Sequence, residues 1–210
     1  MPADTDDEIM LDKLHPLLSI LYKYIDEGIT KAHSFFEIED EPPDPWLFSH
    51  IVRWHVCKRL DSLNDPHLSY ERSPQAMSGI EIFYEDRYIK VFKASDGELP
   101  AAGRSRPRQE FYRGNLFGED EWGLPTRLAV IWEVNGSYHL LDIQLVCPDD
   151  GPAWESGQQK WARTIPHPME FTPAQPTTVN DGATDLEEIR RAEDAEDLDI
   201  SEEETGTEEQ

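Results

Sequence analysis

The pair Asn135-Gly136 lies between two apolar runs and constrains the fold of this chain more than any other feature. A type I′ turn needs positive φ at both central residues, and Asn-Gly is a pair that adopts it readily. We therefore expect a β-hairpin over residues 126–147 in which Val134 faces Ser137. One face of this hairpin is predicted to be a core face, made of Leu128, Val130, Trp132, Val134, His139, Leu141, Ile143 and Leu145.

The opposite face of the expected hairpin mixes polar and apolar side chains, so we expect it to be half covered or to line a groove. In this register Asp142 faces Ala129, which brings Arg127 diagonally within reach of Asp142. One interpretation is an ion pair on a solvated face. In the other, Arg127, Glu133 and Asp142 form the polar floor of a binding groove.

Two amphipathic helices are expected before the hairpin. Apolar residues recur at spacings of three and four over residues 9–36, which indicates a first helix, with Pro16 in the first turn of its main part. Asp44 and the proline after it suit the N-cap and first position of a second helix over residues 45–63. Helices this close in sequence are expected to pack as an antiparallel hairpin.

The remaining segments predict a small sheet and short connections. Residues 64–78 are rich in Pro, Ser, Asn and Asp and are expected to form a loop. Residues 80–94 alternate apolar and polar side chains around a charged break, which indicates a second β-hairpin. We expect a short helix near residues 107–116 and a last one that closes the domain near Ile165.

The charge of the chain is concentrated toward its C-terminal end. The sequence has 44 acidic and 19 basic residues, a net charge of −25, and 15 acids but only two bases follow Pro166. Residues 166–210 contain few apolar side chains, and burying these cannot offset the entropy cost of ordering the segment. We therefore expect residues 166–210 to be a disordered acidic tail. Residues 1–8 are expected to be an acidic leader. Residues 9–165 form a single predicted α+β domain, an N-terminal helical hairpin packed on a small antiparallel sheet of two β-hairpins.

Composition also narrows the class of protein. The excess of acid argues against broad binding to nucleic-acid phosphates. Cys57 and Cys147 are too few for a disulfide framework or a zinc site and are expected to be buried thiols. The N-terminus does not resemble a signal peptide, and no apolar run approaches the ~20 residues of a membrane span. We therefore expect a cytoplasmic protein with no metal, no cofactor and no membrane contact.

An arginine-rich loop is the first candidate binding site. It holds the concentrated positive charge of the sequence, in Arg104, Arg106, Arg108 and Arg113. Arginines beside the aromatic residues Phe111 and Tyr112 suit contacts with phosphates or bases. The same arginines can instead pair with nearby acids in a solvated loop or be screened by the acidic tail.

The second candidate is the pair His55 and Arg59, one helical turn apart on an apolar face. Facing Asp142 or Glu133 across a groove, they would form a general acid–base constellation. The structural interpretation makes His55 a satisfied core histidine and lets Arg59 bury its stem while its charged end reaches water.

Two functional hypotheses follow. The first is a non-enzymatic interaction or regulatory module, comparable to immunity proteins and antitoxins, whose acidic tail and a groove beside residues 126–147 engage a partner protein with a basic surface. The second starts from element order, because a helical hairpin followed by an antiparallel sheet resembles the RelE-type messenger-RNA-cleaving toxins. That resemblance implies an RNA- or nucleotide-processing enzyme that uses the arginine-rich loop, His55, Arg59 and Asp142. The sequence has no catalytic motif, which favours the first hypothesis.

Overall fold

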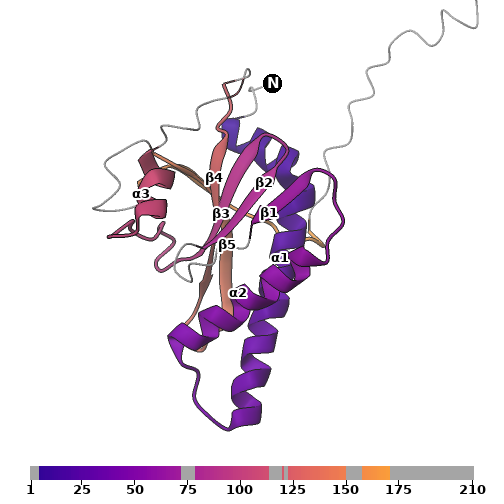
Figure 1. The fold of residues 1–210 in the computed structure, drawn as a ribbon, viewed down its shortest axis with the longest axis vertical. Coiled ribbons are helices and arrows are strands. Elements are labelled where there is room, and N and C mark those ends of the chain that lie inside the picture. The colour runs from indigo at the N-terminus through magenta and orange to yellow at the C-terminus, as the bar shows by residue number, and fades with distance from the viewer. Residues whose placement is uncertain (1–4, 72–78, 114–119, 121–122, 150–157, 171–210) are drawn as a thin grey trace, which may run out of the picture. The chain divides into compact units, whose positions relative to one another are not determined.

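The computed structural model describes residues 5–71, 79–113, 120, 123–149 and 158–170, all of which belong to one compact unit, Met1–Thr172. Within these residues the chain is α+β, with helices on both faces of a six-stranded sheet (Figure 1). The acidic tail predicted for residues 166–210 lies outside the described residues from residue 171 onward.

The elements are α1 (Asp6–Glu39), α2 (Pro45–Asp61), β1 (Leu68–Glu71), β2 (Ile80–Tyr84), β3 (Arg87–Lys93), α3 (Arg106–Arg113), β4 (Arg127–Val134), β5 (Leu140–Pro148) and β6 (Gln159–Thr164). The strands lie in the sheet in sequence order. Strands β3 and β4 pair in parallel, and the other neighbours are antiparallel. A parallel pair needs a long crossover, and the segment that contains α3 supplies it.

The sheet has six strands, whereas two antiparallel hairpins were expected. Strand β1 lies within residues 64–78, which were expected to be a loop, and pairs with β2. Strand β6 occupies residues where a closing helix was expected, and residues 150–157 of that helix lie outside the described part of the chain. Both added strands pair backbone groups along strands that would otherwise be edges of the sheet. Ile165, which follows β6, is buried in the core.

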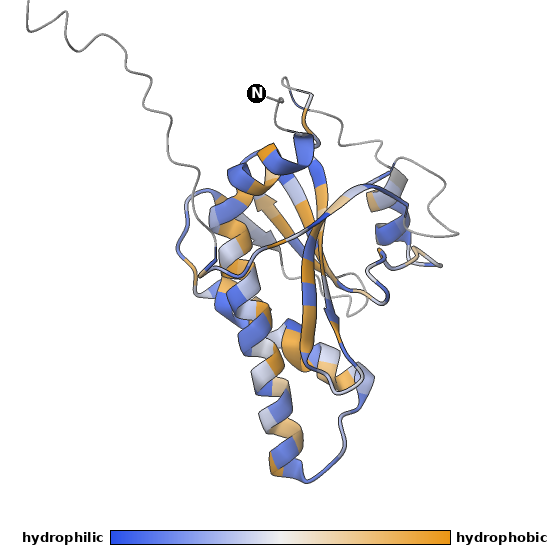
Figure 2. Ribbon diagram, turned by 180° about the vertical axis from the view of Figure 1, so that it is seen from behind, coloured by the Kyte–Doolittle hydropathy of each residue, from blue (hydrophilic) through white to orange (hydrophobic). Residues whose placement is uncertain are grey.

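The main core lies between the two long helices and one face of the sheet. Figure 2 shows apolar residues along the long strands behind α1. The helices touch closely at Gly28, where an added Cβ would lie 3.1 Å from the Val52 carbonyl oxygen. Helix α1 continues through Pro16, which was expected in the first turn of its main part, and Pro16 lies on the exposed face of the helix.

The N-terminal end of α1 lies inside the segment that was expected to be a leader. The helix begins at Asp6, and the Thr5 backbone N–H donates to Glu8 Oε2 at 3.3 Å. This hydrogen bond is the backbone half of a capping box. It satisfies the Thr5 backbone N–H, which has no backbone acceptor within the helix. Asp7 in the first turn is buried and pairs with Arg163 on β6.

A second, smaller core covers the other face of the sheet. Its members come from β3, β4, β5, α3 and the crossover: Tyr88, Phe92, Ala94, Leu99, Ala102, Phe111, Tyr112, Ala129, Ile131 and Val146. The hairpin face that was expected to be half covered is buried at Arg127, Ala129, Ile131 and Val146, and it remains partly exposed at Glu133, Asp142 and Gln144.

The β4–β5 hairpin forms with a register that differs from the predicted one. Ala129 faces Val146, and Glu133 faces Asp142. The turn is wider than two residues because the Asn135 side chain accepts the backbone N–H groups of Ser137 and His139, at 2.9 and 3.0 Å.

An irregularity next to this turn changes which side chains reach the core. The pairing shifts between Glu133 and Val134, and Leu141 is 59% exposed. The expectation that Leu141 and His139 lie on the core face was wrong, whereas Val130 and Trp132 are buried as predicted.

Candidate functional site

His55 and Arg59 connect the two long helices. His55 Nε2 and Arg59 Nε each lie 3.2 Å from Glu27 Oε2 on α1. The Arg59 guanidinium also lies 5.0 Å from the centre of the Tyr24 ring. Asp142, on β5, instead accepts a hydrogen bond from Gln144 Nε2 at 2.7 Å. The two α2 residues therefore pair with Glu27 in place of Asp142 or Glu133.

Arg127 and Glu133 have structural partners. Arg127 is buried beneath α3, where its Nη1 donates to the Phe111 carbonyl oxygen at 2.6 Å. The Glu133 carboxylate accepts the backbone N–H groups of Asp96 and Gly97, at 2.9 and 3.0 Å. The predicted ion pair between Arg127 and Asp142 is replaced by these contacts, because the register places Glu133 opposite Asp142.

The described arginines of the crossover lie in different surroundings. Arg106 Nε lies 2.8 Å from Glu110 Oε1 in an exposed pair, which matches the expectation of pairing with local acids. Arg104 is exposed, and the side chain of Arg113 lies outside the described part. Arg108 differs from them: its guanidinium lies 5.6 Å from the centre of the Phe92 ring, beside a cavity.

This cavity, of about 200 Å³, lies between α2 and the adjoining ends of β2, β3 and β4. Its polar lining consists of Ser49, His50, Arg53, Lys93 and Arg108. Three of its lining residues are Lys or Arg and none of the described ones is Asp or Glu, in a chain with 44 acids and 19 bases. The lining of the cavity is therefore rich in basic side chains compared with the chain as a whole.

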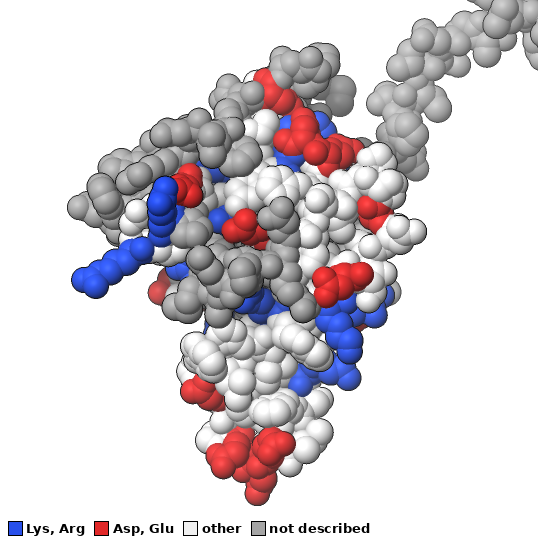
Figure 3. All heavy atoms as spheres, in the orientation of Figure 1, with Lys and Arg blue, Asp and Glu red and all other residues white. Residues whose placement is uncertain are grey.

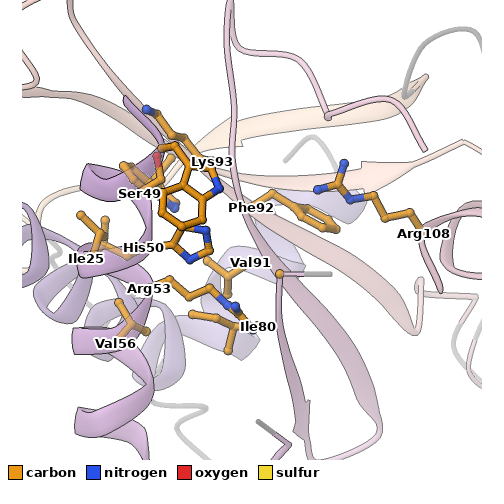
Figure 4. Close-up of a pocket in the computed structure, with 14 residues that line it drawn as sticks. Ile25, Ser49, His50, Arg53, Val56, Ile80, Val91, Phe92, Lys93 and Arg108 are labelled. Atoms are coloured by element: carbon orange, nitrogen blue, oxygen red, sulfur yellow. The ribbon is translucent and has the colours of Figure 1, made fainter. Parts of the chain in front are cut away.

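Figure 4 shows how the elements supply these side chains. His50, Arg53 and Val56 project from α2 toward the strands, and Arg108 lies on the other side, beside Phe92. Residues 46, 50 and 53 follow the helical spacing of one face of α2, which was the one sequence signal that could have pointed to this cavity. The other contributors come from β3, β4 and α3, so sequence reasoning missed the combination.

Aromatic surfaces flank the charged groups of the cavity. Trp46 is 64% exposed, and the centre of its ring lies 4.2 Å from that of His50. The buried Trp132 lines the floor from β4. The Lys93 ammonium lies 5.8 Å from the centre of the Trp132 ring and 5.7 Å from that of Tyr138. Burial lowers the pKa of Lys93 from its ordinary value.

The lower tip of the face that contains α2 is acidic. Figure 3 shows red atoms at this tip, where α1 and α2 connect, and both blue and red atoms in the middle of the face. The described residues at this tip, Glu37, Glu39, Asp40 and Glu41, are all exposed. An approaching anionic group is therefore repelled at the tip.

The volume of the cavity limits the size of the group that it can hold. Pockets for drug-sized molecules measure roughly 300–1,000 Å³, so this one fits a single side chain or a small ion. In the described part of the chain, no group of three or more His, Cys, Asp or Glu is placed to hold a metal ion. None of the described helices is long and apolar enough to cross a membrane.

Comparison with protein-family models, curated proteins and solved structures finds no match to this chain.

Proposed function

We propose that this protein is a non-enzymatic interaction or regulatory module that binds a segment of a partner protein in the cavity beside α2. The observation that carries the proposal is a cationic cavity next to an exposed tryptophan in a strongly acidic chain. Tryptophan and arginine are enriched among the residues that dominate binding energy at protein interfaces. The small cavity volume favours an anchoring side chain over a whole cofactor.

Two parts of the chain contribute different kinds of contact in this proposal. The cavity takes Trp132 from β4 and provides a short-range anchor, although Arg127, Glu133 and Asp142, which were expected to form the floor of a groove, do not line it. The acidic residues after Pro166 provide long-range attraction to a basic surface of the same partner. Cys57 and Cys147 are buried thiols that form no disulfide, which supports a reducing compartment such as the cytoplasm.

An RNA-processing activity is less well supported. Its candidate acid–base pair, His55 and Arg59, is engaged by Glu27 on α1. Arg106 pairs with Glu110, and Asp142 is held by Gln144. His55 and Arg59 thus join α2 to α1, and Arg106 and Asp142 have partners within their own helix and strand.

The test compares two tryptophans on the same helix. Trp46 borders the cavity, whereas Trp54 is outside it and similarly exposed, at 56% against 64%. Partners captured from the native cell by the wild-type protein are identified by mass spectrometry, produced in pure form, and their affinities measured by calorimetry. We expect Trp46→Ala to weaken binding roughly 30-fold, as for the loss of an interface hot spot.

Trp54→Ala is the matched control and should bind the partner like the wild type. Equal loss in both variants would indicate a general effect of exposed tryptophans and would contradict a site at the cavity. Unchanged binding by Trp46→Ala, with the fold retained in circular dichroism, would refute the proposal.

A further inference from the structure

Two of the three basic residues of β3 form ion pairs with acidic side chains. Arg87 is fully buried and bonds to Asp120, and Lys90 Nζ lies 3.0 Å from Glu81 Oε1. Lys93, at the end of the same strand, contacts the two aromatic rings described above. Among the described residues, no carboxylate forms an ion pair with it.

An ammonium group that is partly removed from water is destabilised unless an anion or polar group compensates it. Ring faces compensate in part, through the cation–π interaction. The chain has more than two acids for each base, yet none in the described part is paired with Lys93. The lowered pKa of Lys93 reflects the same incomplete compensation.

We infer that the cavity receives a carboxylate carried next to an aromatic side chain of the partner segment, and that Lys93 is the residue that binds this carboxylate. The inference rests on the proposed function and names the chemistry of its ligand. Of the three basic residues that line the cavity, Lys93 supplies the ammonium for the carboxylate, and Trp46 and Trp132 offer surfaces for an accompanying ring. The cavity of about 200 Å³ is large enough for such a group and too small for a nucleotide.

Two probes of nearly identical shape test this chemistry. Phenylacetate carries a ring and a carboxylate, and phenylacetamide is its neutral counterpart. Each is titrated into the full-length protein while the side-chain resonances of Lys93 and Trp132 are followed by NMR. Phenylacetate is expected to shift both resonances in a saturable way and to raise the pKa of Lys93, because a bound anion stabilises the charged ammonium. Phenylacetamide is expected to bind about tenfold more weakly or not at all.

Lys58 provides the matched control residue. It is exposed on α2 with its ammonium 5.2 Å from the centre of the Trp54 ring, outside the cavity. Lys93→Gln should remove the preference for phenylacetate, and Lys58→Gln should retain it. If Lys93→Gln fails to fold, the pKa of Lys93 in the wild-type protein, with and without phenylacetate, decides the question alone.

Three results would overturn the inference: equal binding of the two probes, an unchanged preference in Lys93→Gln, or a pKa of Lys93 that phenylacetate leaves unmoved. Phenyl phosphate is titrated as a third probe, and tenfold tighter binding of it would replace the carboxylate by a phosphate. Partner binding that depends on Trp46 but not on Lys93 would overturn this inference while leaving the proposed function intact.

Discussion

Glu27 on α1 and His55 on α2 lie 28 positions apart in the sequence, and the Glu27 carboxylate approaches His55 Nε2 to 3.2 Å. The same carboxylate oxygen contacts Arg59 one helical turn further along α2. Histidine and arginine on an apolar helix face therefore mark a helix–helix contact here. A residue pattern that fits acid–base chemistry can equally be explained by a carboxylate on the neighbouring helix.

Replacing Glu27 should reduce stability and leave partner binding unchanged. Glu27→Gln keeps the shape of the side chain but removes the charge that faces His55 and Arg59. The pair is partly exposed, so we expect the free energy of unfolding to fall by about 1 kcal/mol. Urea denaturation measures it, with Glu37→Gln on the exposed side of α1 as the control. A loss of partner affinity in a folded Glu27→Gln protein would show that this cluster does more than join the helices.

Two leucines of β5 distinguish the observed register from the predicted one. Leu141 is 59% exposed beside the irregularity, and Leu145 is fully buried opposite Val130. Leu141→Ser should change the free energy of unfolding by less than about 0.5 kcal/mol, as surface substitutions do. Leu145→Ala should cost about 2–5 kcal/mol, because it leaves a cavity in the core. Similar losses in both variants would support the predicted register, in which both leucines face the core.

The hairpin shows how far the sequence determines this fold. The Asn135-Gly136 pair predicted the position of the turn, and the apolar residues Val130 and Trp132 predicted the buried strand. Both predictions succeeded because they depend on residues that are close together in the sequence. The register was missed because the Asn135 side chain caps two backbone donors and Tyr138 adopts a φ of +61°. No rule of residue type predicts positive φ for a tyrosine.

The candidate site was less predictable than the fold. The parallel pairing of β3 with β4 brings Lys93 beside Trp132, 39 positions later in the chain. Helix α2 then adds His50 and Arg53 from the opposite direction. None of these residues belongs to a local motif, so only the tertiary structure assembles them.

Deleting residues 173–210 should slow association with the partner and reduce its dependence on salt. The deletion removes 14 acids and two bases, and electrostatic attraction acts mainly on the association rate. At low ionic strength we expect an association rate about tenfold lower, with a smaller difference in 0.5 M salt. Stopped-flow fluorescence measures both. A scrambled tail of the same composition should restore the rate, and failure to do so would point to a specific sequence in the tail instead of its charge.

Asp7 gives a prediction for the dependence of stability on pH. A hydrogen bond from the Thr5 side chain, and then the Arg163 guanidinium, hold the pKa of Asp7 below its ordinary value of 3.8. A carboxylate with a lowered folded-state pKa stabilises the protein above its unfolded pKa, and this contribution is lost as the pH falls through the folded pKa.

Asp7→Asn should therefore be less stable than the wild type at pH 7, by about 1 kcal/mol, the scale of an ion pair at a helix N-terminus. The difference should shrink below about pH 4, where the Asp7 carboxyl of the unfolded chain becomes neutral, and should disappear below the lowered pKa of the folded protein. Asp6→Asn, at the exposed neighbouring position, controls for the charge of the first turn. Thermal unfolding of the three proteins between pH 3 and 7 measures the effect, and a constant difference between Asp7→Asn and the wild type would show that the ion pair between α1 and β6 does not contribute to folding stability.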